Sequence, residues 1–213
     1  LRLHPKLTLL FECRDLSHAS AASGSRCGVV WLGGEGNPLG ALVARAEAIV
    51  RGDATGNTTS RGDASDRLRD EIATAFAPGG LVETAVALAL ERGGHVMPLC
   101  ATEAVLAARA LAEGAEAEAL DALAETAGGE EAVVPALRCR LLLAAFWAAA
   151  AGLGEGARVD LSATLLKSPC ATGILALPPG ASLADVHIAL RGEEAGYWRT
   201  WEELAPEPQL RPE

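Results

Sequence analysis

Apolar positions near the start of the chain recur with a period of two. In residues 7–13 every second residue is apolar, as in a strand with one buried face, and residues 27–32 form a second apolar run of strand length. A loop rich in Ser, Ala and Gly separates the two runs. This pattern predicts a pair of strands at the N-terminal end.

From Pro38 the apolar period becomes helical. Asn37 is a favourable helix cap, and Pro38 suits the first helical position, where no backbone N–H needs an intrahelical partner. Glycines and a Pro-Gly-Gly turn then act as helix stops, including Gly114. We expect about five to six alanine-rich helices in residues 38–152, near 38–50, 65–77, 80–92, 102–113, 115–127 and 131–151.

Beyond Gly156 the period of two returns. Residues 158–165 alternate apolar and polar side chains, and two further strands are expected at 172–177 and 185–191. Two N-terminal strands alone would not be stable, so the ends of the chain should share one sheet. We predict an α+β fold in which a mainly antiparallel sheet, built from N- and C-terminal strands, packs against an alanine-rich helical middle.

Length and composition favour one domain followed by a short arm. The 213 residues suffice for a substantial core, and half of them are apolar, which excludes global disorder. We interpret residues 1–204 as a single α+β domain with a helical insert at 38–152. The proline-rich residues 205–213 are expected to form an extended C-terminal arm.

Charge narrows the range of partners. The formal net charge is −10, with no basic cluster, and phosphate binding needs concentrated Lys and Arg, so nucleic acid is not expected as a partner. The longest apolar run, residues 141–153, is shorter than the roughly 20 residues that a membrane span needs, and no span is predicted.

The cysteines and histidines indicate neither a disulfide framework nor a metal site. The five cysteines are an odd number without a Cys-x-x-Cys pair, and no histidine has a ligand-like residue three or four positions after it. A reducing compartment fits best: the cytoplasm, or an organelle matrix if a targeting peptide has been removed. No cofactor is predicted.

Two cysteines are candidates for thiol chemistry. Cys100 opens a predicted helix, whose backbone dipole favours a thiolate, and Cys170 follows a predicted strand. The stretches 97–102 and 168–173 distantly resemble the paired cysteine motifs of the proline racemase and diaminopimelate epimerase class. They depart from that family at the residues after each cysteine, Ala101-Thr102 and Ala171-Thr172-Gly173. The resemblance implies a cofactor-independent enzyme in which one thiol removes an α-proton and the other returns it; otherwise both thiols are small buried hydrophobic groups.

A glycine-rich turn offers a second alternative. Gly33, Gly34, Gly36 and Asn37 lie between a predicted strand and a predicted helix, a context in which backbone N–H groups bind anions. The spacing differs from the dinucleotide motif, and Glu35 adds negative charge where a phosphate would sit. This turn predicts at most a weak site for a small anion or nucleotide.

The C-terminal aromatic residues carry the main functional hypothesis. Tyr197, Trp198 and Trp201 fall within five positions, and large amphipathic rings near a terminus are common anchors at protein interfaces. They could equally pack on the chain's own sheet. Because no acid, base or metal groups converge in the sequence, we expect a non-catalytic subunit that binds other protein subunits in an oligomer or larger intracellular assembly. The residues leave open whether the protein is an enzyme.

Overall fold

A computed structural model describes residues 20, 38–52, 63–125, 129–192 and 195–205 of the chain. The chain divides into residues 1–33 and residues 34–213, and every element described below belongs to the second unit. The strands predicted at 7–13 and 27–32 and the arm predicted at 205–213 lie outside the described residues, apart from Ala205.

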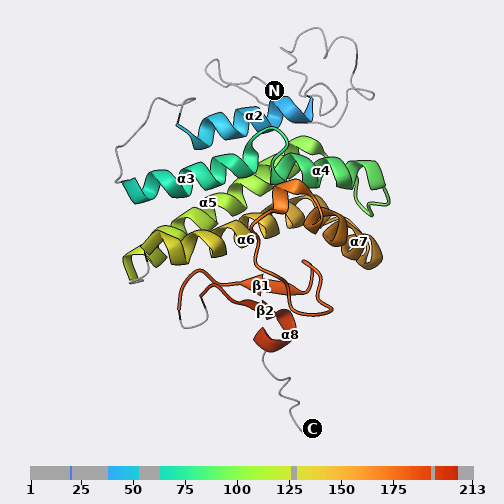
Figure 1. The fold of residues 1–213 in the computed structure, drawn as a ribbon. Coiled ribbons are helices and arrows are strands. Elements are labelled where there is room, and N and C mark those ends of the chain that lie inside the picture. The colour runs from blue at the N-terminus through green and yellow to red at the C-terminus, as the bar shows by residue number, and fades with distance from the viewer. Residues whose placement is uncertain (1–19, 21–37, 53–62, 126–128, 193–194, 206–213) are drawn as a thin grey trace, which may run out of the picture. The chain divides into compact units, whose positions relative to one another are not determined.

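The described part of the chain is mainly helical and ends in a small antiparallel sheet (Figure 1), which confirms the α+β class with a helical middle. In chain order the elements are α2 (Leu39–Val50), α3 (Asp63–Phe76), α4 (Leu81–Arg92), α5 (Ala101–Glu125), α6 (Gly129–Ala150), α7 (Glu155–Leu166), the 3₁₀ turn η1 (Pro169–Ala171), β1 (Val186–Ile188), β2 (Trp198–Thr200) and α8 (Trp201–Leu204).

Helix α5 is one continuous helix of 25 residues, so the prediction of two helices that end and begin at Gly114 was wrong. The reason is a stripe of buried alanines, spaced three or four residues apart, that runs straight through the glycine. These alanines keep one face of the helix against α6, and their burial outweighs the roughly 1 kcal/mol by which glycine weakens a helix interior. The stripe comprises Ala104, Ala108, Ala112, Ala115, Ala119 and Ala122.

Helix α6 is the centre of the core. It contacts α3, α4, α5, α7 and β1, and its contact with α5 is the most extensive in the structure. Leu137, Leu142 and Phe146 are fully buried on it, and truncating any one of them would cost about 2–5 kcal/mol. Pro135 lies inside its first half and is tolerated there.

Helix α7 replaces the strand that the alternation at 158–165 predicted. Leu161 and Leu165, four positions apart, are both fully buried, so the same residues satisfy a helical period. Val159, which a half-buried strand would cover, is 47% exposed. Ser162, which a strand would expose, is buried and its oxygen accepts the Leu183 N–H at 2.9 Å. The short stretch was compatible with both periods, and the helical one packs better.

The sheet is smaller than predicted. Strand β1 covers only three residues in the first half of the strand expected at 185–191, and the strand expected at 172–177 is irregular backbone. Strand β1 pairs with β2, with His187 opposite Arg199. Residues 172–177 still contribute to the core, because Ile174 and Leu177 pack against it from the side.

Within the described residues, two stretches have the length and apolar composition to cross a membrane: Asp66–Arg92 and Gly129–Ala150. The first is interrupted by the turn at 77–80, which separates α3 from α4. The second is α6, and 72% of its apolar window is buried inside the protein. Packing against neighbouring helices therefore accounts for its apolar character.

Replacing glycine by alanine should have opposite effects at two sites. An alanine methyl at Gly114 would meet no atom within 4 Å beyond its chain neighbours and the backbone of its own helix, so G114A should raise the free energy of unfolding by about 0.5–1 kcal/mol. At Gly80 the same methyl would lie 2.7–2.8 Å from three backbone carbonyl oxygens, and G80A should lower it by about 1–3 kcal/mol. Urea unfolding followed by circular dichroism measures both. A destabilising G114A would contradict the continuous α5.

Candidate functional site

The predicted aromatic cluster is held by its own domain. Trp198 packs against the core, and its indole N–H donates to the Leu175 carbonyl at 3.0 Å. The Trp201 indole N–H donates to the Ala184 carbonyl at 3.1 Å, and its ring lies 5.3 Å from the His187 ring. Tyr197 remains 69% exposed. Trp198 therefore packs on its own domain, whereas Tyr197 and much of Trp201 face solvent, and their role as interface anchors stays a prediction.

Among the described residues of this C-terminal region, four large apolar side chains are exposed. Together Leu175, Tyr197, Trp201 and Leu204, which are 36–69% exposed, are called the C-terminal surface below. Their backbone is well supported. Helix α8 begins with a capping box, in which the Thr200 side chain accepts the Glu203 N–H and Glu203 accepts the Thr200 N–H. Arg199 also donates to Glu203 at 2.9 Å.

Charged contacts tie the two-stranded sheet to the helices beneath it. Arg140 of α6 donates to the Ile188 carbonyl and to Glu118 of α5, and Glu118 accepts the Leu190 N–H. The region that carries the C-terminal surface is thus fixed to α5 and α6. His187 lies over this network, and its pKa is lowered, first by burial and then by the positive charge of Arg140, against an opposing effect of Glu118.

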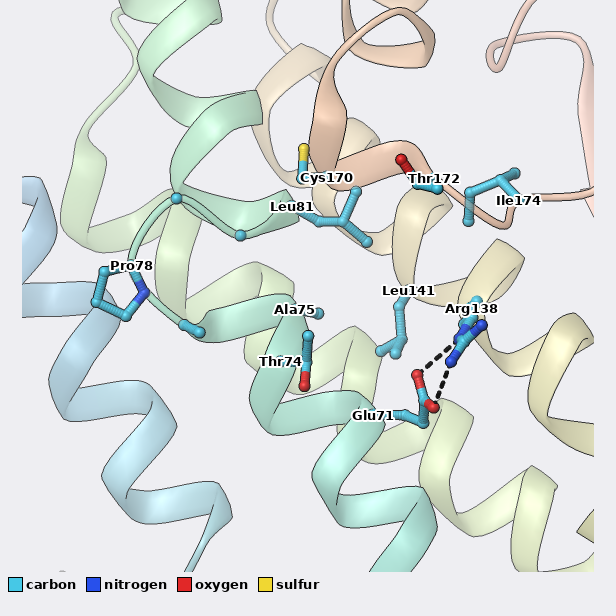
Figure 2. Close-up of a pocket in the computed structure, with 13 residues that line it drawn as sticks. Glu71, Thr74, Ala75, Pro78, Leu81, Arg138, Leu141, Cys170, Thr172 and Ile174 are labelled. Carbon is cyan, nitrogen blue, oxygen red and sulfur yellow. Dashed lines mark hydrogen bonds and ion pairs between the residues drawn. The ribbon is translucent and has the colours of Figure 1, made fainter.

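A second candidate site is a cavity of about 380 Å³ between α3, the α3–α4 turn, α6 and the η1 region, shown in Figure 2. Polar groups in its wall are Glu71, Thr74, Arg138, Cys170 and Thr172. Apolar side chains supply the rest, including Ala75, Leu81, Leu141 and Ile174. Its volume is within the range of small-molecule sites.

An ion pair forms one side of the cavity (Figure 2). The Arg138 guanidinium donates through Nε and Nη2 to the two oxygens of Glu71, at 2.7 and 2.6 Å. This bidentate geometry raises the pKa of Arg138. Sequence reasoning did not single out either residue. They are 67 positions apart, and their pairing depends on how α3 packs beside α6, for which no local signal exists.

The candidate thiols occupy different surroundings. Cys170 lines the cavity, with its sulfur 2.9 Å from Ser168 Oγ. Cys100 directly precedes α5 as expected, is half-buried, and is not among the residues that line this cavity. Cys139 is fully buried on α6, and burial raises its pKa to about 11, which suppresses its thiolate. The two-thiol hypothesis stays a prediction.

Two other expectations concern anions and metals. Gly33, Gly34, Gly36 and Asn37 lie outside the described residues. Among the residues that the structure places, no group of three or more His, Cys, Asp or Glu side chains is arranged to hold a metal ion.

Comparison with known proteins adds little. No protein-family model matches the chain. The cytoplasmic dynein heavy chain of Eremothecium gossypii is 53% identical to it over 32 residues. That match covers 15% of this chain and 1% of the dynein chain, so this chain spans a very small part of that protein's length. A match of this extent does not identify a family.

Acidification should weaken the C-terminal region through His187. An unfolded histidine has a pKa of about 6.5, and the folded pKa is lower, so the unfolded state binds the proton more readily. The free energy of unfolding should therefore fall as the pH drops through and below about 6.5. Urea unfolding at pH 7.5 and 5.5 measures this fall, which should be smaller in His187→Gln.

Tryptophan fluorescence gives a local readout for the same variant pair. Protonated His187 should shift the emission of Trp201 beside it, and His187→Gln should lack this shift. Equal pH responses of the wild-type protein and His187→Gln, in both stability and fluorescence, would show that His187 does not titrate in this way.

Proposed function

We propose that this protein is a non-catalytic subunit that binds another protein through its C-terminal surface, within an intracellular oligomer or larger assembly. The observation that carries the proposal is the exposure of Tyr197, Trp201 and Leu204 on a backbone that is already ordered by hydrogen bonds. Exposed aromatic side chains in one short region are typical of binding anchors.

Preorganisation favours binding over a purely structural role for these residues. Trp201 is fixed by its hydrogen bond to Ala184 and its contact with His187, yet 46% of it is exposed. A side chain that is already fixed loses little conformational entropy when a partner covers it. Tyr197 has two side-chain torsions, so its ordering also costs little.

The negative charge of the chain indicates which charge its partner should carry. The chain carries a net charge of −10, and Glu202 and Glu203 lie beside Trp201 on α8. A partner with apolar and basic side chains would bury the rings and meet these carboxylates, whereas an acidic partner would be repelled. We therefore expect a neutral or basic protein surface to occupy the C-terminal surface.

A double substitution tests this proposal without removing an internal hydrogen bond. Tyr197→Ser with Leu204→Ser removes large side chains that are 69% and 43% exposed, and it should reduce the affinity for the partner at least about tenfold, since buried aromatic anchors commonly contribute 2 kcal/mol or more. Native mass spectrometry and size-exclusion chromatography with light scattering, on protein from its source extract, measure the assembly.

The chain supplies a matched control. Leu106 and Leu111 on α5 are 54% and 48% exposed, so Leu106→Ser with Leu111→Ser removes a similar kind of surface elsewhere. This control should leave the assembly intact. A monomer in the source extract, or equal losses in the two double variants, would rule out binding through the C-terminal surface.

A further inference from the structure

We propose that the cavity in Figure 2 binds a small, uncharged organic molecule with a compact apolar body and a hydrogen-bond acceptor of the carbonyl or amide type. This site is distinct from the C-terminal surface, and the proposal does not depend on protein binding. Three properties of the cavity wall define the ligand: its apolar side chains, its available hydrogen-bond donor and its charge balance.

The apolar body follows from the side chains that line the cavity. Ala75, Leu81 and Leu141 lie in the cavity wall but are only 3–7% exposed, whereas Ile174 is half-buried against the core and leaves part of its side chain accessible. Pro78 adds a rigid ring from the α3–α4 turn. A ligand here would meet apolar surface chiefly at Ile174 and Pro78, which favours a small, compact, branched hydrocarbon part.

The ligand needs a hydrogen-bond acceptor because of the donors in the cavity wall. The Thr74 and Thr172 hydroxyls already donate to the carbonyls of Asp70 and Pro169, both at 2.7 Å. Nε and Nη2 of Arg138 donate to Glu71, whereas Nη1 has no hydrogen-bond partner among the described residues. The available side-chain donor of the wall is therefore the Arg138 guanidinium, which requires an acceptor on the ligand.

The ligand should be uncharged because the charges around the cavity already compensate one another. Glu71 neutralises Arg138 in bidentate geometry. At the adjacent start of α4, Glu83 accepts the Gly79 N–H at 2.7 Å and offsets the positive end of that helix. An anion or a cation would lose its hydration without meeting an uncompensated opposite charge. An uncharged ligand avoids this cost.

Isobutyramide and isobutyrate form a matched pair of probes, because they share a branched apolar body and differ in charge. We would titrate each into the ¹⁵N-labelled full chain and follow backbone amide resonances. Isobutyramide should shift the resonances of residues 75–81 and 170–174 with a dissociation constant of roughly 1–10 mM, as expected for so small a ligand. Isobutyrate should bind at least tenfold more weakly.

Two substitutions test the geometry and the charge separately. Thr74 is exposed on α3, so Thr74→Phe fills the cavity without altering the core and should abolish the isobutyramide shifts. Ala107→Phe, at an exposed position of α5 outside the cavity wall, is its control and should leave them unchanged. Glu71→Gln keeps the shape of the side chain but leaves the positive charge of Arg138 uncompensated. It should therefore strengthen isobutyrate binding and reduce or reverse the preference for isobutyramide over isobutyrate.

Three results would overturn the proposal. Isobutyrate could bind the wild-type chain as tightly as isobutyramide, isobutyramide could leave residues 75–81 and 170–174 unshifted, or Glu71→Gln could leave the preference unchanged.

Alkylation of Cys170 by iodoacetamide provides a second readout: its sulfur displaces iodide, a C–S bond forms and the thiol proton passes to solvent. Isobutyramide should slow this reaction at Cys170 and not at Cys100, which lies outside the cavity wall. Equal effects on both thiols would also contradict the site.

Discussion

The close packing of α5 on α6 is the contact on which the rest of the structure depends. Alanine methyl groups let two helices approach closely, but each buries little apolar area, so the contact must be long to be stable. Helices of 25 and 22 residues provide that length. The larger side chains of α6, such as Leu142 and Phe146, complete the core among the other elements that α6 contacts. A chain with only 4% aromatic residues can build a dense core in this way.

Both candidate sites follow from the position of α6. Arg138 and Arg140 lie two residues apart on this helix, and they reach different partners: Arg138 pairs with Glu71 of α3 at the cavity, whereas Arg140 holds Glu118 and the Ile188 carbonyl under the sheet. The cavity exists because α3, its turn into α4 and the η1 region meet beside α6 without filling the space between them. The C-terminal surface is presented because β1 rests on the same helix.

Sequence reasoning predicted the helical middle well and the irregular parts poorly. Pro38 and the Pro78-Gly79-Gly80 turn mark helix boundaries that the structure confirms to within a few residues, because both act through local backbone chemistry. Gly114 was wrongly predicted to end a helix. The three- or four-residue spacing of alanines continues through it and would have indicated a single helix. Residues 158–165 were misread because a short segment can satisfy two periods, and only tertiary packing chooses between them. No local sequence pattern could predict the Glu71–Arg138 pair, because its members are 67 positions apart. The aromatic cluster at Tyr197–Trp201 was visible in the sequence, and only the inward orientation of Trp198 required coordinates.

Charge pairing sets what the outside of the protein offers to a ligand or partner. Many of the described arginines form ion pairs with acidic side chains: Arg51, Arg67, Arg69, Arg92, Arg109, Arg138, Arg140, Arg191 and Arg199. Exposed pairs of this kind add little stability, but each one neutralises a positive charge locally. The acidic residues in excess give the chain its net charge of −10, and a net charge of this sign repels polyanions on average. The two proposed sites share this setting: Trp201 lies beside Glu202, and the cavity lies beside an Arg138 that Glu71 neutralises.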